Sequence, residues 1–213
     1  MTTSGAFTEY TIPTGSYIPN GITTGPDGAL WFTEYSNNIG RVTTSGAFTE
    51  YTIPTASSDP IGITTGPDGA LWFAEQIGSN KIGRVTTSGA FTEYTVPTAN
   101  SDPGAITTGP DGALWFAEND GNKIGRVTTS GAFTEYPTPT ANSDPIGITT
   151  GPDGALWFTE LDANKIGRVT TSGAFTEYTV PTAGGYPLGI TTGPDGALWF
   201  TETGGSKIGR LSP

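Results

Sequence analysis

The string G-P-D-G-A-L-W-F, which first occurs at residues 25–32, decides the fold of this protein. It recurs at residues 66–73, 109–116, 151–158 and 193–200. A second string, T-T-S-G-A-F-T-E-Y, also occurs five times and begins at residues 2, 43, 86, 128 and 170. A fixed period of about 42 residues indicates tandem units that each form one supersecondary structure. Five such units account for the whole length of 213 residues.

Each unit contains four short strand signals separated by turns. In the first complete unit we expect strands at residues 21–24, 29–33, 39–42 and 48–53. The G-P-D-G string makes the first turn, because Pro fixes φ at its first corner and Asp-Gly suits the positive φ that follows. Pro54 ends the fourth strand, since it cannot donate a hydrogen bond to a neighbouring strand. Four antiparallel strands in about 40 residues are typical of a β-propeller blade.

The second strand of each unit indicates that both faces of the sheet are covered. Leu30 and Phe32 point to one face of this strand, and Ala29 and Trp31 point to the other. Both faces are therefore apolar, which a blade between two neighbouring blades satisfies and a sheet with one solvated face does not.

The order of the strand signals predicts how the propeller closes. Residues 1–14 hold the fourth strand of a blade, whereas the last repeat holds three strands and lacks the fourth. We therefore expect one all-β domain, a closed five-bladed β-propeller in which this N-terminal outer strand completes the last blade. Such a ring is a monomer; the alternatives are an open array that closes only by oligomerising and a ring of another size that shares blades between chains. The repeats lie at about residues 15–55, 56–98, 99–140, 141–182 and 183–213.

The composition excludes several classes of site and partner. The chain has no cysteine and no histidine, so it can form neither a Cys-ligated or HExxH zinc site nor a Ser-His-Asp triad. Its 20 acidic and 9 basic residues give a net charge of −11, which disfavours nucleic acid and anionic membranes as partners. Its apolar runs are too short to cross a bilayer. No apolar leader follows Met1, so we expect no signal peptide, and no segment identifies a compartment.

The repeat resembles a known family. Residues 145–173 read P-I-G-I-T-T-G-P-D-G-A-L-W-F-T-E-L-D-A-N-K-I-G-R-V-T-T-S-G, which is similar to the repeat of the virginiamycin B lyases and related streptogramin lyase-like propellers. The resemblance extends over every repeat. It implies a propeller of seven blades and a magnesium-assisted elimination that opens the ester-linked ring of streptogramin B antibiotics, with a histidine as a key catalytic group.

The sequence departs from this family pattern in two respects. It has five repeats, and it has no histidine, so the catalytic base of the family cannot be assigned to any position. Near-identical repeats also offer mainly the same group five times, whereas an active site needs different groups that converge on one asymmetric substrate. We therefore expect the fold without the enzymatic activity.

The loops at the two ends of the blades differ in how much they vary among the repeats. The G-P-D-G and T-T-S-G turns share one end and are identical in all five copies. The loops at the other end, which we call the top face, differ. They lie at residues 15–18, 35–37, 56–59, 76–79, 99–102, 119–121, 141–144, 161–163, 183–186 and 203–206. Their variation fits either solvated loops without a function or a ligand-binding surface on a rigid scaffold.

Two groups of top-face residues are candidates for ligand binding. The first is the carboxylate that ends each second strand: Glu34, Glu75, Glu118, Glu160 and Glu202. If these side chains faced the axis, they would form an acidic ring that attracts a hard cation; the alternative is that each pairs with the lysine of the next strand or with a backbone N–H. The second group is Tyr17, Tyr35 and Tyr186, which fall where the ring is expected to close and are suited to binding.

The other repeated residues have structural interpretations. The tryptophans are expected in the core, and the aspartate of each G-P-D-G string is expected to stabilise its turn. The arginines of the third strands are expected to pair with the glutamate of the F-T-E-Y string. These arginines are Arg41, Arg84, Arg126, Arg168 and Arg210.

These observations support three hypotheses for the function. The first is a non-catalytic symmetric scaffold without a cofactor, either engineered from a lyase-like repeat or encoded by a recently amplified one. The second is a binding module that uses the top face or the central channel for a small molecule, a glycan or a cation. The third is an enzyme similar to the streptogramin B lyases, which the missing histidine disfavours.

Overall fold

The computed structural model describes residues 5–13, 18–35, 37–76 and 78–213 of the chain. Within these residues all regular structure is β, and it forms five antiparallel sheets. Four sheets have four strands, and the last has three. This part of the chain contains no helix, and thus none long and apolar enough to cross a membrane. The all-β fold predicted from the repeats is confirmed.

Each sheet corresponds to one repeat, and we refer to the sheets as blades one to five. Blade one contains β1 (Pro19–Thr24), β2 (Leu30–Glu34), β3 (Asn38–Val42) and β4 (Phe48–Thr52). Blade two contains β5 (Pro60–Thr65), β6 (Leu71–Glu75), β7 (Lys81–Val85) and β8 (Phe91–Thr95). Blade three contains β9 (Pro103–Thr108), β10 (Leu114–Glu118), β11 (Lys123–Val127) and β12 (Phe133–Pro137). Blade four contains β13 (Pro145–Thr150), β14 (Leu156–Glu160), β15 (Lys165–Val169) and β16 (Phe175–Thr179). Blade five contains β17 (Pro187–Thr192), β18 (Leu198–Glu202) and β19 (Lys207–Leu211).

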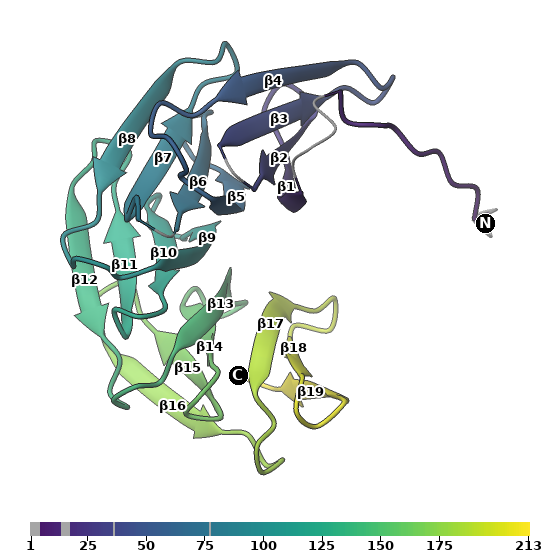
Figure 1. Ribbon diagram of the computed structural model, residues 1–213. Coiled ribbons are helices and arrows are strands. Elements are labelled where there is room, and N and C mark those ends of the chain that lie inside the picture. The colour runs from purple at the N-terminus through teal and green to yellow at the C-terminus, as the bar shows by residue number, and fades with distance from the viewer. Residues whose placement is uncertain (1–4, 14–17, 36, 77) are drawn as a thin grey trace.

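The five blades lie along an arc around a common axis (Figure 1). The first strand of every blade lies on the inner side of the arc and contacts the first strand of the next blade, while β4, β8, β12 and β16 lie on the outer side. The strands match those predicted from the sequence to within two residues at each end, because the Pro, Gly and Asp residues that bound them act locally.

Apolar layers between neighbouring blades form the core. The layer between blades two and three contains Trp72, Leu114 and Phe116, none of which is exposed. Trp72 stacks on Tyr94 of the outer strand with ring centroids 5.6 Å apart, and Phe116 meets Phe133 edge-on at 6.2 Å. The prediction that both faces of the second strand are covered is confirmed.

One glycine is required by this packing. Gly83 lies opposite Phe73 in the pairing of β7 with β6, and the Phe73 ring covers its Cα. A side chain at position 83 would overlap the ring. This explains the K-I-G-R pattern of the third strands in physical terms, since the phenylalanine of each second strand needs a neighbour without a side chain.

The arginines of the third strands pair differently from what the sequence suggested. Arg126 Nε donates to Asp111 Oδ2 at 2.7 Å, while Asp111 Oδ1 accepts from Trp115 Nε1 at 3.0 Å. The same pairing with the G-P-D-G aspartate occurs in all five blades. The expected pairing with the F-T-E-Y glutamate is wrong, because the turn brings its aspartate back over the tryptophan, where the arginine side chain also lies at 5.9 Å from the ring centroid.

The F-T-E-Y glutamate instead links neighbouring blades. Glu135 of blade three accepts a hydrogen bond from the backbone N–H of Thr98, which follows the outer strand of blade two, at 2.9 Å. Lys123 forms an ion pair with Glu135 at 3.1 Å and also donates to the Thr98 hydroxyl. The same three groups recur as Thr140, Lys165 and Glu177 at the next interface. We call this arrangement the interblade clamp.

The structure does not confirm the predicted closure of the ring. The expected partner of residues 1–14 is β19, yet the last sheet contains only three strands. The described residues 5–13 form no strand. They lead from the N-terminal end towards blade one, with an opening between blade one and blade five (Figure 1). The interfaces between blades are close-packed, so their geometry sets the angle between blades, and five blades at this angle leave the ring open.

Candidate ligand-binding site at the channel mouth

The inner strands of all five blades line a central cavity of about 510 Å³. In blades two to five its wall is built from a glycine and the apolar residue next to it near the start of the inner strand, namely Ile61, Ala105, Ile146 and Leu188, and in blade one from Asn20 and Gly21. Small residues are needed here because five strands converge on one axis, and the backbone of one blade approaches the next: the carbonyl oxygen of Gly104 would lie 2.7 Å from a Cβ at Gly62. The wall of the cavity is therefore largely apolar.

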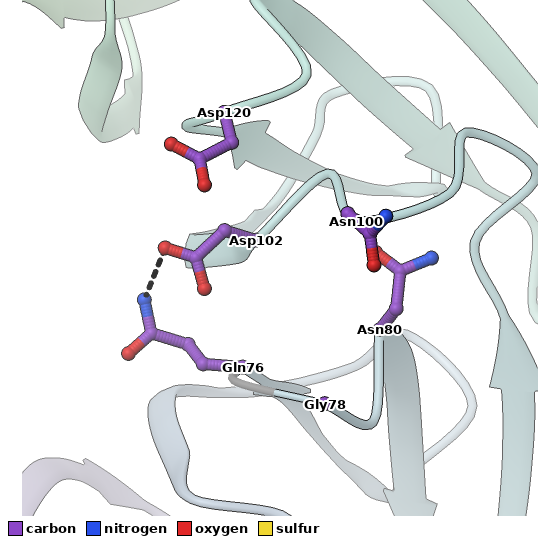
Figure 2. A pocket seen from close by; sticks show the side chains of 6 residues that line it. All are labelled: Gln76, Gly78, Asn80, Asn100, Asp102 and Asp120. Carbon is purple, nitrogen blue, oxygen red and sulfur yellow. Dashed lines mark hydrogen bonds between the residues drawn. The ribbon is translucent and has the colours of Figure 1, made fainter.

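Polar side chains of blades two to four surround one side of the cavity at the top face. Gln76, Asp102 and Asp120 line an adjoining cavity of about 360 Å³, which Figure 2 shows. Gln76 Nε2 donates to Asp102 Oδ2 at 3.3 Å. A third cavity, of about 210 Å³, is lined by residues that include Asn119, Asp120 and Asp144.

The three cavities share lining residues and therefore adjoin one another. Gln76 lines the central cavity and the first polar one, Asn119 lines the central cavity and the second, and Asp120 lines both polar cavities. We call the combined region the channel mouth. Its floor is apolar, and its polar rim contains carboxylates and amides but no basic side chain among the lining residues.

Backbone conformation holds the aspartates of the rim in place. Asp102 and Asp144 have φ values of 51° and 50°, in the left-handed region that Asp tolerates better than most residues. Their carbonyl oxygens accept hydrogen bonds from the backbone N–H groups of Asn119 and Leu161, at 3.2 Å and 3.0 Å. Each hydrogen bond joins the loop that enters a blade to the loop between the second and third strands of the same blade. The backbone positions of Asp102 and Asp144 are thereby fixed.

The electrostatics of the rim disfavour further negative charge. Burial raises the pKa of Asp102, and the neighbouring carboxylates of Asp120 and Asp144 raise it further. Burial likewise raises the pKa of Asp144, and Asp162 and Asp120 add to the effect. Because several carboxylates repel one another here, a ligand that brings positive charge or hydrogen-bond donors would be favoured.

The rim differs between the interior and the terminal blades. The position held by Asp102 and Asp144 is occupied by Ile18 in blade one and by Tyr186 in blade five, as the corresponding hydrogen bonds show. Tyr186 also has a positive φ, of 48°. The channel mouth itself has an acidic side on blades two to four, whereas the residues that line it from the terminal blades are uncharged: Asn20, Gly21, Leu188, Gly189 and Thr201.

The glutamates proposed as a cation-binding ring do not line the channel mouth. Glu34, Glu75, Glu118, Glu160 and Glu202 are all buried within their own blades. Glu118 lies against Gly121 of the loop above it, and the Ser101 hydroxyl, which donates to Asn80 at 2.9 Å, is also close to the carboxylate. Among the described residues, no group of three or more acidic side chains is placed to hold a metal ion.

The expected pairing of these glutamates with the lysines is also not seen in the structure. Lys81, Lys123 and Lys165 pair with the F-T-E-Y glutamates of the interblade clamp instead. Burial raises the pKa of Glu118 to about 8, and the Glu135 carboxylate adds to this rise while Lys123 opposes it. The pKa of Glu75 is raised to about 8 and that of Glu160 to about 7 for the same reasons. At neutral pH these side chains are thus held largely protonated or close to it.

The tyrosine candidates are not brought together. Tyr17 lies outside the described residues. Tyr35 and Tyr186 are 39% and 47% exposed, but they belong to blades one and five, on opposite sides of the opening in the arc. Asp102, Asn119, Asp120 and Asp144 were not predicted as individual site residues from the repeat pattern. The signal that could have found them is the acidic or amide character of the top-face loops in the middle repeats alone.

Comparisons with known proteins agree with the repeat pattern. The model of the virginiamycin B lyase family matches residues 1–213. The crystal structure of selenomethionine-substituted virginiamycin B lyase from Staphylococcus aureus is 50% identical, with a TM-score of 0.96 over 100% of this chain and 73% of that chain. A catalytically inactive variant of that lyase with quinupristin, in which one histidine is replaced by alanine, is also 50% identical, with a TM-score of 0.95 over 98% and 71% of the two chains. A streptogramin B lyase structure is 42% identical, with a TM-score of 0.91 over 99% and 74%. No curated protein sequence matches the chain.

The chain spans about three quarters of the length of these relatives. If 213 residues cover 73% of the first lyase chain, that chain has about 290 residues, which leaves about 80, or close to two further repeats. The five blades superpose on the lyase with a TM-score of 0.96, so they keep its angle from blade to blade.

Proposed function

The chain belongs to the virginiamycin B lyase family, and from this premise we propose that it is a non-catalytic propeller that binds a small molecule at the channel mouth. The observation that carries the non-catalytic part is that the 213 residues contain no histidine. In the Staphylococcus aureus relative, replacement of one histidine by alanine gives a protein described as catalytically inactive.

The glutamates whose pKa values are raised most are not placed to replace this histidine. Abstraction of a proton next to a carbonyl needs a base whose pKa is near the working pH and which reaches the substrate. The raised pKa values of Glu75, Glu118 and Glu160 satisfy the first requirement. Their side chains are buried and line none of the three cavities of the channel mouth, so they do not satisfy the second.

The residues of the described structure also do not fit the magnesium ion that the family resemblance implies. Magnesium requires several oxygen ligands in octahedral geometry, usually including one or two carboxylates. No group of three acidic side chains is placed for it in the described ranges. Asp102 of the rim already accepts a hydrogen bond from Gln76. We therefore derive no chemical step through a metal ion.

The channel mouth supports binding because it combines two kinds of surface. Its apolar floor suits a hydrophobic body of a ligand, and its acidic side suits hydrogen-bond donors or a positive charge. Its asymmetry favours a single orientation, since the acidic side chains line it only on the side of blades two to four. A small molecule with an apolar body and a cationic or donor-rich end fits this description best.

Incubation with quinupristin, the molecule present with the inactive relative, tests both parts of the proposal. Mass spectrometry after incubation with and without magnesium should show the intact mass only. A ring-opened product above the level of the protein-free control would contradict the non-catalytic part and favour lyase activity, which the family match supports.

Titration calorimetry with the same molecule tests the binding part. We expect binding, weakened about tenfold, or about 1.4 kcal/mol, when Asp102 and Asp144 are both replaced by asparagine. The variant Ser130→Ala, in a turn at the opposite end of blade three, is the control and should bind like the parent chain. Absence of binding to the parent chain would contradict the channel-mouth part and leave the scaffold hypothesis.

A further inference from the structure

The outer edge of β19 is open in the last blade. In blades one to four, the third strand pairs with a fourth strand whose sequence begins F-T-E-Y. In the described part of the chain, β19 has no such partner. A groove of about 450 Å³ lies beside it, lined by residues of β16 and of blade five that include Tyr178, Phe200 and Leu211.

The aromatic contacts of a complete blade show what this groove lacks. In blade four, Trp157 stacks on Tyr178 with centroids 5.6 Å apart, and Phe158 meets Phe175 edge-on at 6.1 Å. The equivalent residues of blade five are Trp199 and Phe200. Neither has an aromatic partner among the described residues. Phe200 lines the groove, which therefore has room for the missing Phe, whereas Trp199 points to the opposite face of the blade, where the missing Tyr would stack.

The interblade clamp is incomplete at the same place. Glu177 of blade four accepts from the Thr140 N–H at 3.0 Å and pairs with Lys165 at 2.7 Å. In blade five, Lys207 donates to the Thr182 hydroxyl at 3.0 Å, but no described carboxylate pairs with it. A glutamate in the groove would complete the clamp.

Residues 7–11, F-T-E-Y-T, carry the side chains that blade five lacks, in the same order as residues 175–179. Phe7 is 95% exposed and Tyr10 is 48% exposed. Tyr10 lies against Gly46 of blade one, and the described segment 5–13 forms no strand. These residues therefore leave apolar surface in contact with water.

We propose that residues 7–11 of a second copy of this chain bind beside β19 as the fourth strand of blade five. The pairing of β15 with β16 fixes the register: Thr8 would lie opposite Arg210, as Thr176 lies opposite Arg168, and Tyr10 would lie opposite Ile208. Backbone hydrogen bonds supply affinity, while Phe7, Glu9 and Tyr10 supply specificity, as in other cases of strand addition.

The packing of the arc favours a second copy over the chain's own segment. Closure within one chain would bring blade five against blade one, which requires a larger angle at every one of the interfaces between consecutive blades. These interfaces are filled by buried Trp, Leu and Phe side chains, and such cores resist deformation. Exchange of the N-terminal segment leaves all of them unchanged, and a reciprocal exchange covers both open edges in a closed dimer.

Engineered cysteines test the proposal directly, because the chain has none of its own. Thr8→Cys and Arg210→Cys are made as two separate single variants and mixed under mild oxidation. We expect a disulfide-linked dimer containing one copy of each variant. The control replaces Arg210→Cys by Ser130→Cys, in the exposed turn of blade three, and should give only background cross-linking.

The double variant Thr8→Cys/Arg210→Cys separates the two possible donors of the strand. Cross-linked dimers support exchange between copies, whereas a cross-linked monomer as the main product would overturn the proposal and show that the chain closes on itself. Absence of any cross-link would also overturn it.

Light scattering of the unmodified chain gives an independent measurement. We expect the mass of a dimer, and a shift to monomer with at least a tenfold higher dissociation constant in Phe7→Ala/Tyr10→Ala. Circular dichroism should be unchanged, since both residues are largely outside the core. A parent chain that remains monomeric at micromolar concentration would contradict the proposal.

Discussion

Blade three and blade five have nearly the same sequence but different surroundings. In blade three, Trp115 is fully buried and stacks on Tyr136 at 5.5 Å. In blade five, Trp199 is partly exposed and has no described aromatic partner. The ion pair beside each tryptophan differs in the same way. In blade three the side chains of Arg126 and Asp111 are 22% and 19% exposed, whereas in blade five those of Arg210 and Asp195 are 44% and 39% exposed.

The difference shows how much of a blade's stability depends on its neighbours. Repeat proteins gain stability from interfaces between adjacent units, so a unit with two neighbours and four strands is stabilised more than one with a single neighbour and three strands. The local sequence is sufficient for β17, β18 and β19 to form. It is not sufficient to cover the apolar side chains of these strands.

Equivalent tryptophan substitutions should have unequal effects. We expect Trp115→Ala to lower the free energy of unfolding by about 3–5 kcal/mol, because it leaves a cavity in a fully buried layer. Trp199→Ala should cost about 1–2 kcal/mol, since part of the side chain is already in water. Urea-induced unfolding followed by circular dichroism measures both.

The loss of stability in Trp199→Ala depends on the place of blade five at the end of the arc, and also on whether a second copy covers that blade. The measurements are therefore repeated in the Phe7→Ala/Tyr10→Ala background, where blade five should keep its open edge at all concentrations. Equal losses of stability for the two variants in that background would show that the interior and terminal blades are packed alike.

The strands were predictable from the sequence because their limits are set by local chemistry. Pro, Asp and Gly define the turns, and the apolar residues on both faces of 29–33 define the covered strand. The closure of the ring could not be predicted in the same way. It depends on the angle at which Trp72 and Phe116 pack between two blades, and no local pattern encodes that angle.

The candidate site was predicted only in outline. The variable top-face loops do surround the cavities, but the glutamates selected from them are buried, and the arginines pair with Asp rather than Glu. These outcomes depend on side-chain direction at the end of a strand and on the path of a turn. Asp102 and Asp144 reach the channel mouth because of a left-handed backbone conformation that their sequence permits but does not require.

The buried glutamates should give interior blades a specific dependence on pH. The pKa of Glu118 is about 8 in the folded protein, against 4.5 for the same side chain in the unfolded chain. Folding therefore favours the protonated form. The contribution of protonated Glu118 to the free energy of unfolding is fully present below pH 4.5 and is lost as the pH rises towards 8. Relative to the parent chain, Glu118→Gln should therefore become more stable between pH 5 and pH 8.5, by on the order of 1–3 kcal/mol.

Glu135→Gln in the same blade is the matched control, and its effect should have the opposite sign. Burial alone would raise the pKa of Glu135, but the Thr98 N–H and Lys123 outweigh it and lower the pKa. This glutamate therefore stabilises the fold above its unfolded-state pKa, and Glu135→Gln should destabilise the protein throughout the range in which Glu118→Gln gains. Urea midpoints at pH 5, 7 and 8.5 test both, and parallel profiles for the two variants would contradict the assignment.

The smallest effect is expected for the turn aspartates. Burial alone would raise the pKa of Asp111, but hydrogen bonds from Trp115 and Arg126 lower it overall. Its contribution is therefore present above the unfolded-state pKa and is lost as the pH falls through the lowered one. Asp111→Asn keeps an oxygen for Trp115 Nε1 but cannot accept from Arg126 Nε, so we expect a loss of about 1 kcal/mol at pH 7.

The equivalent change in blade five, Asp195→Asn, completes the comparison. Its ion pair is more exposed, and water competes for the same donors and acceptors, so the loss at pH 7 should be smaller than in blade three. As the pH falls through the lowered pKa of Asp111, its carboxylate takes up a proton in the parent chain, and the difference between Asp111→Asn and the parent should shrink. An equal loss in both blades at pH 7 would mean that the arginine pair acts through the turn alone, independently of the neighbouring blade that shields it.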